Sequence, residues 1–545
     1  GWHGLSAAKV YIEIHPSEEI LVLESQDSIG GTWAKDRIYA GLKSNNLFDA
    51  YENPDFPMSE EVYGVKPHSH IPGAVLHQYL TDYAKKFGII SRTQFKTNVD
   101  SVEAIKDGYR LSTTGPSGTK VIETKKLIVA TGLTSTPNFP QYRGKDDFQG
   151  QYFHAKDFCR KNETLKAAEN VVVVGGAKSA YDVAYAYATN GAHVDMVIRP
   201  NGKGPVYISK PWVLGGKARL EKLLSVRALT WFSPCPFGGV DGYSWPRWFL
   251  HGTAVGRFIV DKFWASLGGE VIETNAYAKH DALKLLQPRD SAFWIASGLS
   301  ILNYDSDWYE LCKQGKITVH GADIDHLSKQ SVHLTDGTTL KADIVVTATG
   351  WKKEPTIKFI NFGSAGIGLP LSADEQARLV KQTDEEVFTT YPRLRKQPNL
   401  PFENKGDPFR MYRFIVPPAR INEHNIAFAG MVSSVLTANQ ANAQAVWISA
   451  FLDGKLDHLP SSPEEVTREV LLHTQWNKWR YPYGYGATLP DLAFDAQPYL
   501  DLLINDCGLK VNRKAGLYAD LTQPYEPKDY RGLVDEWLEK HPRKV

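Results

Sequence analysis

The segment VVVVGGAKSAYDVAYAYATNGAHVDMVIR, residues 171–199, decides the fold of this chain. It opens with a short, apolar and β-branched run at 171–174, which is typical of a buried parallel strand. Small residues follow, then a helical stretch, and then a second apolar run at 193–198. Strand, tight turn, helix and strand in this order predict the start of a nucleotide-binding βαβ unit, in which a phosphate meets the N-terminus of the helix.

The turn of this unit reads G-x-A-x-x-A instead of G-x-G-x-x-G, and small residues are also common in ordinary βα turns. The residues that we expect to bind a dinucleotide here are Gly175, Ala177, Lys178, Ser179 and Ala180. The second strand ends at Arg199. An acid at that position suits NAD, whereas an arginine suits the 2′-phosphate of NADP, so the sequence indicates an NADPH site. The alternative is that Arg199 is an ordinary surface cation.

Length and composition are those of an ordinary globular protein. A chain of 545 residues is too long to form a single hydrophobic core. At about 150 residues per domain, we expect about two to four domains. A net charge of +1, without a run of Lys or Arg, gives no indication of nucleic-acid binding. No apolar run approaches the ~18 residues of a membrane span. The four cysteines stand far apart, so we expect no disulfide framework, no metal site and a cytoplasmic location.

The chain begins with GWHGLSAAKVYIEIHPSEEILVLE, which has the pattern of the back half of a glycine loop, its helix and a second strand. Glu24 falls about 20 residues after Gly1 and Gly4, where an acid takes the ribose hydroxyls of a dinucleotide. The strand and the glycine that should come before Gly1 are missing, and we therefore expect an N-terminally truncated chain. Residues 1–8 taken alone also fit a simple amphipathic helix.

The next segment, GGTW, combines a turn with an aromatic wall. Gly31 permits a tight turn, Thr32 follows it, and Trp33 supplies a flat apolar surface beside a cofactor. We therefore expect all three residues at a cofactor site.

Several motifs now stand in one order along the chain: GGTW, IYAGLKSN, PDFP and two ATG segments, at 130–132 and 348–350. Between the two ATG segments lies the pattern F-x-G-x-x-x-H-x-x-x-F, at 148–158. With these motifs the chain resembles the flavin-containing monooxygenases. It also matches the fingerprint of the class B flavoprotein monooxygenases, which include Baeyer–Villiger enzymes and N-hydroxylases. The resemblance extends from Gly1 to about Leu456.

This resemblance implies an α/β fold with two Rossmann-like dinucleotide-binding domains, a discontinuous one for FAD and one for NADPH inserted into it. The predicted divisions are 1–165 and 336–456 for FAD, 166–335 for NADPH, about 205–305 for an insertion within the latter, and 457–545 for a C-terminal cap. Further cofactor-binding residues implied by the resemblance are Ala130, Thr131, Gly132, Thr349, Gly350 and Gly430. The fingerprint residues are Phe148, Gly150, His154 and Phe158.

Two positions separate the subfamilies. Baeyer–Villiger enzymes carry an Asp after the GGTW loop, where this chain has Asn45, and they end the fingerprint with Trp followed by Pro or Asp, where it has Phe158 and Cys159. In the flavin-containing monooxygenases proper an Asn positions the nicotinamide and the oxygenated flavin, so the resemblance predicts Asn45 as the catalytic residue. Asn45 could instead be a turn residue, with Asn46 as the functional one. We interpret His154 as a motif residue at the domain junction, without a role as a general base.

The region from 205 to 305 is dense in Trp, Phe, Gly and Pro. It fits a lid or tunnel wall for an apolar or aromatic substrate, and equally an additional small core. A membrane-surface role is less well supported, because the segment lacks a basic amphipathic face. Residues 457–545 contain no motif that indicates a chemical role, and we expect them to cap the flavin domain.

The resemblance implies an FAD enzyme that consumes NADPH and inserts one atom of O2 into a small organic molecule through a C4a-hydroperoxyflavin. Such an enzyme needs neither an acid–base dyad nor a metal, because the cofactor carries the hard step. Because of Asn45 we favour oxygenation of nitrogen or sulfur, of the N,N-dimethylaniline monooxygenase type, over Baeyer–Villiger oxidation of a ketone. The other hypotheses are an uncoupled NADPH oxidase or reductase and an inactive truncated form. The sequence names neither the substrate nor the oligomeric state.

Overall fold

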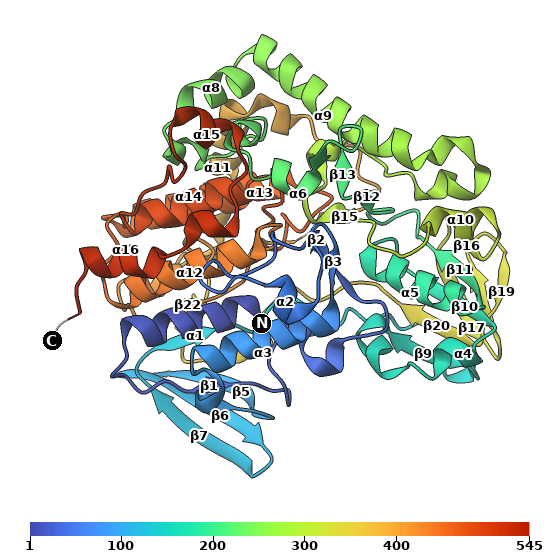
Figure 1. The fold of residues 1–545 in the computed structure, drawn as a ribbon, viewed down its shortest axis with the longest axis horizontal. Helices are drawn as coiled ribbons and strands as arrows, with labels where there is room; N and C mark the ends of the chain where they lie inside the picture. The colour runs from blue at the N-terminus through green and yellow to red at the C-terminus, as the bar shows by residue number, and fades with distance from the viewer. Residues whose placement is uncertain (364, 405, 544–545) are drawn as a thin grey trace.

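The computed structural model describes residues 1–363, 365–404 and 406–543. Figure 1 shows one α/β part at the lower left, built mainly from the N-terminal residues, and a second α/β part at the right. Green and red helices lie above them, from the middle of the chain and from its C-terminal end. Within the described residues, none of the helices combines the length and the apolar character that a membrane crossing requires.

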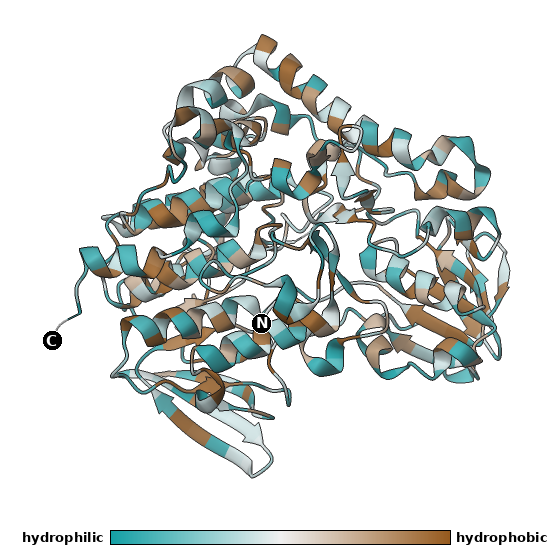
Figure 2. Cartoon of the chain, viewed as in Figure 1, coloured by the Kyte–Doolittle hydropathy of each residue, from teal (hydrophilic) through white to brown (hydrophobic). Residues whose placement is uncertain are grey.

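The βαβ unit predicted from residues 171–199 is present in the right-hand part. It consists of β10 (Asn170–Val174), α5 (Lys178–Thr189) and β11 (His193–Val197). The strands pair in parallel, with Val173 opposite Met196, and both of these side chains are fully buried. Figure 2 shows these strands as apolar elements, which agrees with burial of both faces of the sheet. Val173 packs with residues of α5 on one face, and Val172 packs on the other face with the antiparallel strands β17 (Ile324–Ser328), β18 (Ser331–Leu334) and β19 (Thr339–Lys341).

Three further parallel strands complete this sheet: β16 (Ile317–His320), β20 (Ile344–Thr347) and β9 (Gln151–His154). The order is β16-β11-β10-β20-β9. The sheet therefore includes a strand of the fingerprint and the strand before the second ATG segment. The predicted divisions at 165/166 and 335/336 cut across it, because β9 and β20 lie outside 166–335 yet pair with each other and with β10.

The lower-left part has two parallel pairs of short strands. One pair is β1 (Val22–Leu23) with β4 (Thr93–Gln94), and the other is β8 (Leu127–Val129) with β22 (Ile426–Phe428). Further elements of this part are α1 (Trp2–Ile14), β2 (Lys43–Leu47), α2 (Glu60–Tyr63), β3 (His70–Pro72), α3 (Gly73–Lys86), β5 (Asn98–Ile105), β6 (Gly108–Gly115), β7 (Gly118–Thr124), β21 (Lys358–Ile360) and α12 (Thr437–Leu452). Helix α12 is buried over nearly its whole length and packs along α1.

The two longest helices of the aromatic insertion, α8 (Ser244–Gly252) and α9 (Ala254–Asn275), lie at the top of Figure 1. The insertion also contains the short helices α6 (Leu220–Leu223) and α7 (Arg227–Thr230). The C-terminal residues form α13 (Pro463–Arg480), α14 (Ala496–Asp506), α15 (Leu517–Thr522) and α16 (Leu533–Lys540).

Insertion and C-terminal helices share one core. Trp264 lies 4.6 Å from Phe494, ring centroid to ring centroid, and the buried Arg480 donates from Nε to the hydroxyl of Ser233 at 3.1 Å. Trp248, in contrast, is 64% exposed. Part of the insertion is therefore an additional core, and part of it presents aromatic rings at the surface.

Candidate cofactor-binding site

Two glycine turns meet at the N-terminus of α1. Gly31 has φ +62°, and a Cβ there would lie 2.9 Å from the Cα of Gly1. A Cβ on Gly4 would lie 3.2 Å from the methyl carbon of Ala130. Only glycine permits the approach of backbones at Gly31, whereas the contact at Gly4 is with a side-chain methyl and is tight without being forbidden. Because the first N–H groups of a helix have no partner within it, the arrangement suits a dinucleotide phosphate.

The GGTW turn faces the first ATG segment. The hydroxyl oxygen of Thr32 lies 3.4 Å from that of Thr134, and Trp33 donates its indole N–H to the hydroxyl of Tyr51 at 3.3 Å. The hydroxyl of Thr131 is buried without a hydrogen-bond partner among the described residues. A buried polar atom of this kind beside two glycine turns fits a bound polar group, and FAD supplies one.

Glu24 and Gly430 complete this side of the site. Glu24 follows β1, and its carboxylate interacts electrostatically with the amino group of Gly1, so it lies near the glycine turn. Its contact with the ribose hydroxyls stays a prediction. Gly430 has φ +79°, and a Cβ there would lie 2.7 Å from the ring of His3. Its N–H donates to the side-chain oxygen of Gln444 at 3.0 Å. Burial lowers the pKa of His3 to about 4, so this ring is neutral.

The second dinucleotide loop follows β10. Gly175 has φ +140°, and a Cβ there would lie 2.5 Å from the carbonyl oxygen of Ala348. Ala180 is fully buried between the helix and the sheet, whereas Ser179 is exposed. Ala177 borders a cavity of about 100 Å³. The side chain of Lys178 pairs with Asp182 of the same helix, so its predicted contact with a phosphate stays a prediction.

Arg199 is exposed at the end of the second strand of this unit. Arg289, from the insertion, donates to the carbonyl oxygens of Arg199 at 3.0 Å and of Pro200 and Gly202 at 2.6 Å. Arg289 and Lys203 also line the cavity beside Ala177. Positive side chains thus gather near the end of this strand, but Arg289 and Lys203 already donate to backbone carbonyl oxygens. Binding of an NADP 2′-phosphate by Arg199 stays a prediction.

The segment after the first ATG motif pairs with the second ATG motif, at the connection between the α/β parts. Asn138 donates its N–H to the carbonyl oxygen of Gly350 at 2.9 Å, and the Thr349 hydroxyl donates to the carbonyl oxygen of Asn138 at 2.6 Å. Gly132 and Gly350 have φ +71° and +85°, so both segments turn sharply after their strands. The connection therefore combines a backbone–backbone hydrogen bond with one from a side-chain hydroxyl.

The fingerprint joins this connection. The ring of His154 lies 5.2 Å from that of Trp351 in an edge-on arrangement, and its Nδ1 accepts from the N–H of Lys156 at 3.1 Å. Burial lowers the pKa of His154, which keeps the imidazole neutral and suits the structural role predicted for it. The guanidinium of Arg37 lies 5.3 Å from the Trp351 ring and donates to the carbonyl oxygen of Thr134 at 3.0 Å.

Packing explains the remaining fingerprint residues. A Cβ on Gly150 would lie 2.3 Å from the carbonyl oxygen of Asp343 and 2.6 Å from the ring of Phe148. Phe158 is buried and packs on Tyr39, at 5.4 Å between ring centroids. The fingerprint is therefore an edge strand and a turn that fix one part of the molecule against the other.

Asn45, the predicted catalytic residue, lies on β2 with its side chain exposed. Asn46 points to the other face, and its amide donates to the carbonyl oxygen of Val435 at 3.4 Å. Both residues stay candidates. Asn45 has no hydrogen-bond partner among the described residues, whereas Asn46 is already engaged.

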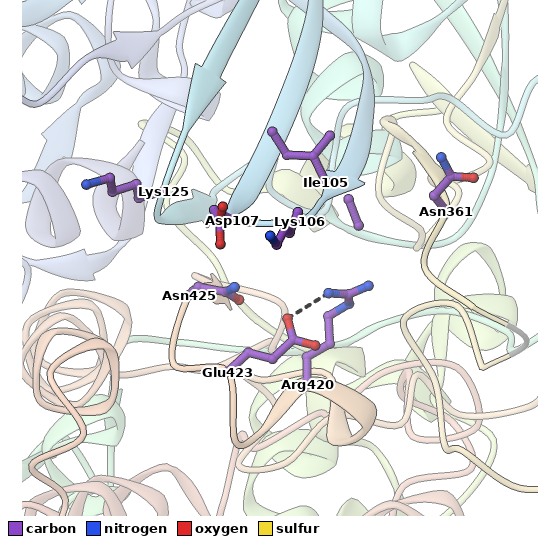
Figure 3. A pocket seen from close by; sticks show the side chains of 9 residues that line it. Ile105, Lys106, Asp107, Lys125, Asn361, Arg420, Glu423 and Asn425 are labelled. Atoms are coloured by element: carbon purple, nitrogen blue, oxygen red, sulfur yellow. Dashed lines mark hydrogen bonds and ion pairs between the residues drawn. The ribbon is translucent and has the colours of Figure 1, made fainter.

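A larger hollow of about 820 Å³ lies elsewhere, beside the turn between β5 and β6. Figure 3 shows that polar side chains surround it and that Arg420 pairs with Glu423, at 2.7 Å. None of the predicted cofactor residues lines it. The predicted cofactor site therefore lies away from this hollow.

Two dinucleotide loops joined through paired ATG segments define a flavoprotein oxidoreductase with two nucleotide cofactors. The model of the pyridine nucleotide-disulphide oxidoreductase family matches residues 4–229. The FAD-dependent monooxygenase rstn6 of Aspergillus nomiae NRRL is 33% identical over 99% of this chain and 96% of its own length. The chain belongs to the FAD-dependent monooxygenases, and it is an enzyme that uses FAD and NADPH.

Solved structures agree with this fold. Cyclohexanone monooxygenase from Rhodococcus sp. Phi1, bound to NADP+, has a TM-score of 0.59 at 17% identity and covers 93% of this chain and 95% of its own. S-allyl-L-cysteine S-oxygenase from Allium sativum has a TM-score of 0.54 at 16% identity, with coverage of 100% and 92%. All four cysteines of this chain are free, and three of them are buried.

Sequence reasoning missed several residues that the structure brings to this site. They are Arg37, Trp351, Lys203, Arg289 and Asp182. The position of Trp351 could have been predicted, since it directly follows an ATG motif. The others are single charged residues, and no sequence pattern marks them.

Proposed function

We propose that this enzyme oxygenates a nitrogen or sulfur atom of an apolar or aromatic small molecule, with NADPH as the electron donor and O2 as the oxygen source. The observation that carries the proposal is Asn45, an uncharged amide on the exposed face of β2. The resemblance associates an Asp at this position with ketone oxidation and an Asn with oxygenation of heteroatoms. The similarity in fold to an S-oxygenase is compatible with it.

FAD, when bound, supplies the activation of O2 and the transfer of one oxygen atom. The chain's own residues hold and shield the reacting atoms. The glycine turns at Gly31 and Gly175 accept the two dinucleotides, and Trp33 and Trp351 provide apolar surfaces that exclude water. The Asn45 amide can donate one hydrogen bond and accept another, which keeps a proton on a neighbouring oxygen without adding a charge. This proton matters because an oxygen atom that is transferred to a lone pair on nitrogen or sulfur has to be electrophilic, and loss of the proton would make it nucleophilic.

A second candidate is Baeyer–Villiger oxidation, and Arg37 is the observation that favours it. Attack on a ketone needs an oxygen nucleophile that carries negative charge, and a nearby cation stabilises that charge. The Arg37 guanidinium, beside Trp351, is held at the connection between the two α/β parts. It remains charged at neutral pH.

A set of three probe substrates separates the candidates. The purified FAD-loaded enzyme is incubated with NADPH and, in turn, with N,N-dimethylaniline, methyl phenyl sulfide and cyclohexanone, and the products are identified by mass spectrometry. The proposal expects an N-oxide or a sulfoxide. A lactone as the sole product would replace it with the second candidate, and Asn45→Asp then serves as the variant in which ketone oxidation should increase.

A further inference from the structure

Asp182, in the second turn of α5, joins three segments of the chain through one carboxylate. Its Oδ1 accepts hydrogen bonds from the ammonium group of Lys178 and from the hydroxyl of Tyr304, the latter at 2.8 Å. Its Oδ2 accepts from the hydroxyl of Tyr39 at 2.7 Å. The three donors come from the NADPH loop, from the end of the insertion and from the segment before β2.

A second set of hydrogen bonds extends this network to the backbone of β2. The Lys178 ammonium also donates to the side-chain oxygen of Asn303 at 2.8 Å. The amide nitrogen of Asn303 then donates to the carbonyl oxygens of Lys43, at 3.2 Å, and Ser44, at 3.1 Å. The next residue along β2 is Asn45. A continuous chain of hydrogen bonds therefore links the first residue of α5 to the strand that carries the candidate catalytic amide.

The network is well shielded from solvent. The side chain of Asp182 is 14% exposed and that of Lys178 is 19% exposed, and Asn303 is 6% exposed. Lys178 also lies over the ring of Tyr304, at 4.7 Å. In such surroundings hydrogen bonds to an ionised carboxylate are strong, and removal of the carboxylate leaves the lysine ammonium without its counter-ion. Burial and the Asp182 charge raise the pKa of Tyr39 and of Tyr304 well above the usual range, so both hydroxyls keep the protons that they donate.

We infer that Asp182 is a positioning residue, which holds β2 and its Asn45 in a fixed place relative to the NADPH loop through Lys178, Tyr39 and Asn303. The positional part of this inference stands on the hydrogen bonds alone, and its consequence for turnover rests on the proposed function. Without the Asp182 carboxylate, we expect β2 and its Asn45 to lose their fixed position relative to the NADPH loop. Reduction by NADPH then continues, while transfer of oxygen to the substrate becomes less efficient.

The test compares Asp182→Asn with Tyr185→Phe in the FAD-loaded enzyme. Tyr185 lies on the same helix and packs on Tyr304 at 4.6 Å, but its hydroxyl contacts Ser306 instead of Asp182. Hydrogen–deuterium exchange at residues 43–47 is the first readout, and it does not depend on turnover. In Asp182→Asn we expect exchange there to become about tenfold faster, with unchanged exchange in β5. In Tyr185→Phe we expect exchange as in the wild type.

The second readout is the share of consumed NADPH that ends as hydrogen peroxide, measured with methyl phenyl sulfide and N,N-dimethylaniline. We expect this share to rise about threefold or more in Asp182→Asn, with little change in KM for NADPH, and to recover in part in Asp182→Glu. Tyr39→Phe, which removes a single hydroxyl, should give a smaller change in the same direction.

Two outcomes would overturn the inference. One is wild-type exchange at residues 43–47 in Asp182→Asn, and the other is a rise in peroxide that Tyr185→Phe reproduces. A wild-type enzyme that oxidises none of the probe substrates would count against the proposed function, and the exchange measurement would still decide the positional role of Asp182.

Discussion

Gly150→Ala tests whether the fingerprint strand β9 packs so closely against its neighbour that position 150 admits no side chain. The added methyl carbon would lie 2.3 Å from the carbonyl oxygen of Asp343. This oxygen accepts the N–H of Gln151 at 3.0 Å, where β9 begins to pair with β20. Ordinary contact needs about 1 Å more, so β9 has to move away. We expect a loss of about 1 kcal/mol for the weakened hydrogen bond and about 1–3 kcal/mol for overpacking.

The assay is thermal unfolding of the FAD-loaded enzyme, followed by circular dichroism and by release of flavin fluorescence. For cooperative unfolding of a chain of this length, a loss of about 2–4 kcal/mol corresponds to a decrease in Tm of about 2–4 °C. The matched control is Gly269→Ala in helix α9, where an added Cβ meets nothing within 4 Å. The control should be neutral or slightly stabilising, because alanine favours a helix. A Gly150→Ala enzyme as stable as this control would refute the packing argument.

Three further predictions concern FAD binding, NADPH binding and the stability of the fold at acid pH. Gly31→Ala should bind FAD at least about tenfold more weakly, because φ +62° strains alanine and its Cβ would approach Gly1; a normal flavin content after purification would contradict this. Arg199→Ser should raise KM for NADPH about tenfold or more with little change for NADH, since a charged hydrogen bond to the 2′-phosphate is lost; equal changes for both nucleotides would exclude that role. Burial lowers the pKa of His251 to about 3, so the folded state keeps this ring neutral while the unfolded chain takes up a proton below its pKa of about 6.5. Stability therefore falls as the pH drops from about 6.5 towards 4.5, and His251→Gln should lose about 2–3 kcal/mol less than the wild type over this range in urea titrations; parallel losses in both proteins would contradict the assignment.

The sequence predicts best those features that depend on local pattern. The run at 171–174 has the composition of a buried strand wherever it occurs, and the small residues after it restrict the turn. The unit of β10, α5 and β11 was accordingly predictable to within a residue at its strand ends. The motif order also sufficed for the family and for both cofactors.

Partner choice between strands was not predictable in the same way. The residues of β20 form an apolar β-branched run that would suit either sheet, and we expected them to return to the flavin half. Only long-range pairing with β10 and β9 decides their place. The same limit applies to tryptophans, since Trp264 is buried and Trp248 exposed although both lie in one aromatic segment. Asp182 carries no local signal, because its partners lie more than a hundred residues away in two of three cases.

The central claim is that this enzyme uses NADPH and O2 to oxygenate a small molecule on its FAD. The most direct measurement mixes the FAD-loaded enzyme with NADPH without oxygen, follows the flavin absorbance, and then admits ¹⁸O2 together with methyl phenyl sulfide. We predict rapid bleaching of the flavin, its return to the oxidised form, and a sulfoxide that contains one ¹⁸O atom. Bleaching and reoxidation with hydrogen peroxide as the only product, for this sulfide and for amine and ketone probes alike, would contradict the claim and indicate an NADPH oxidase.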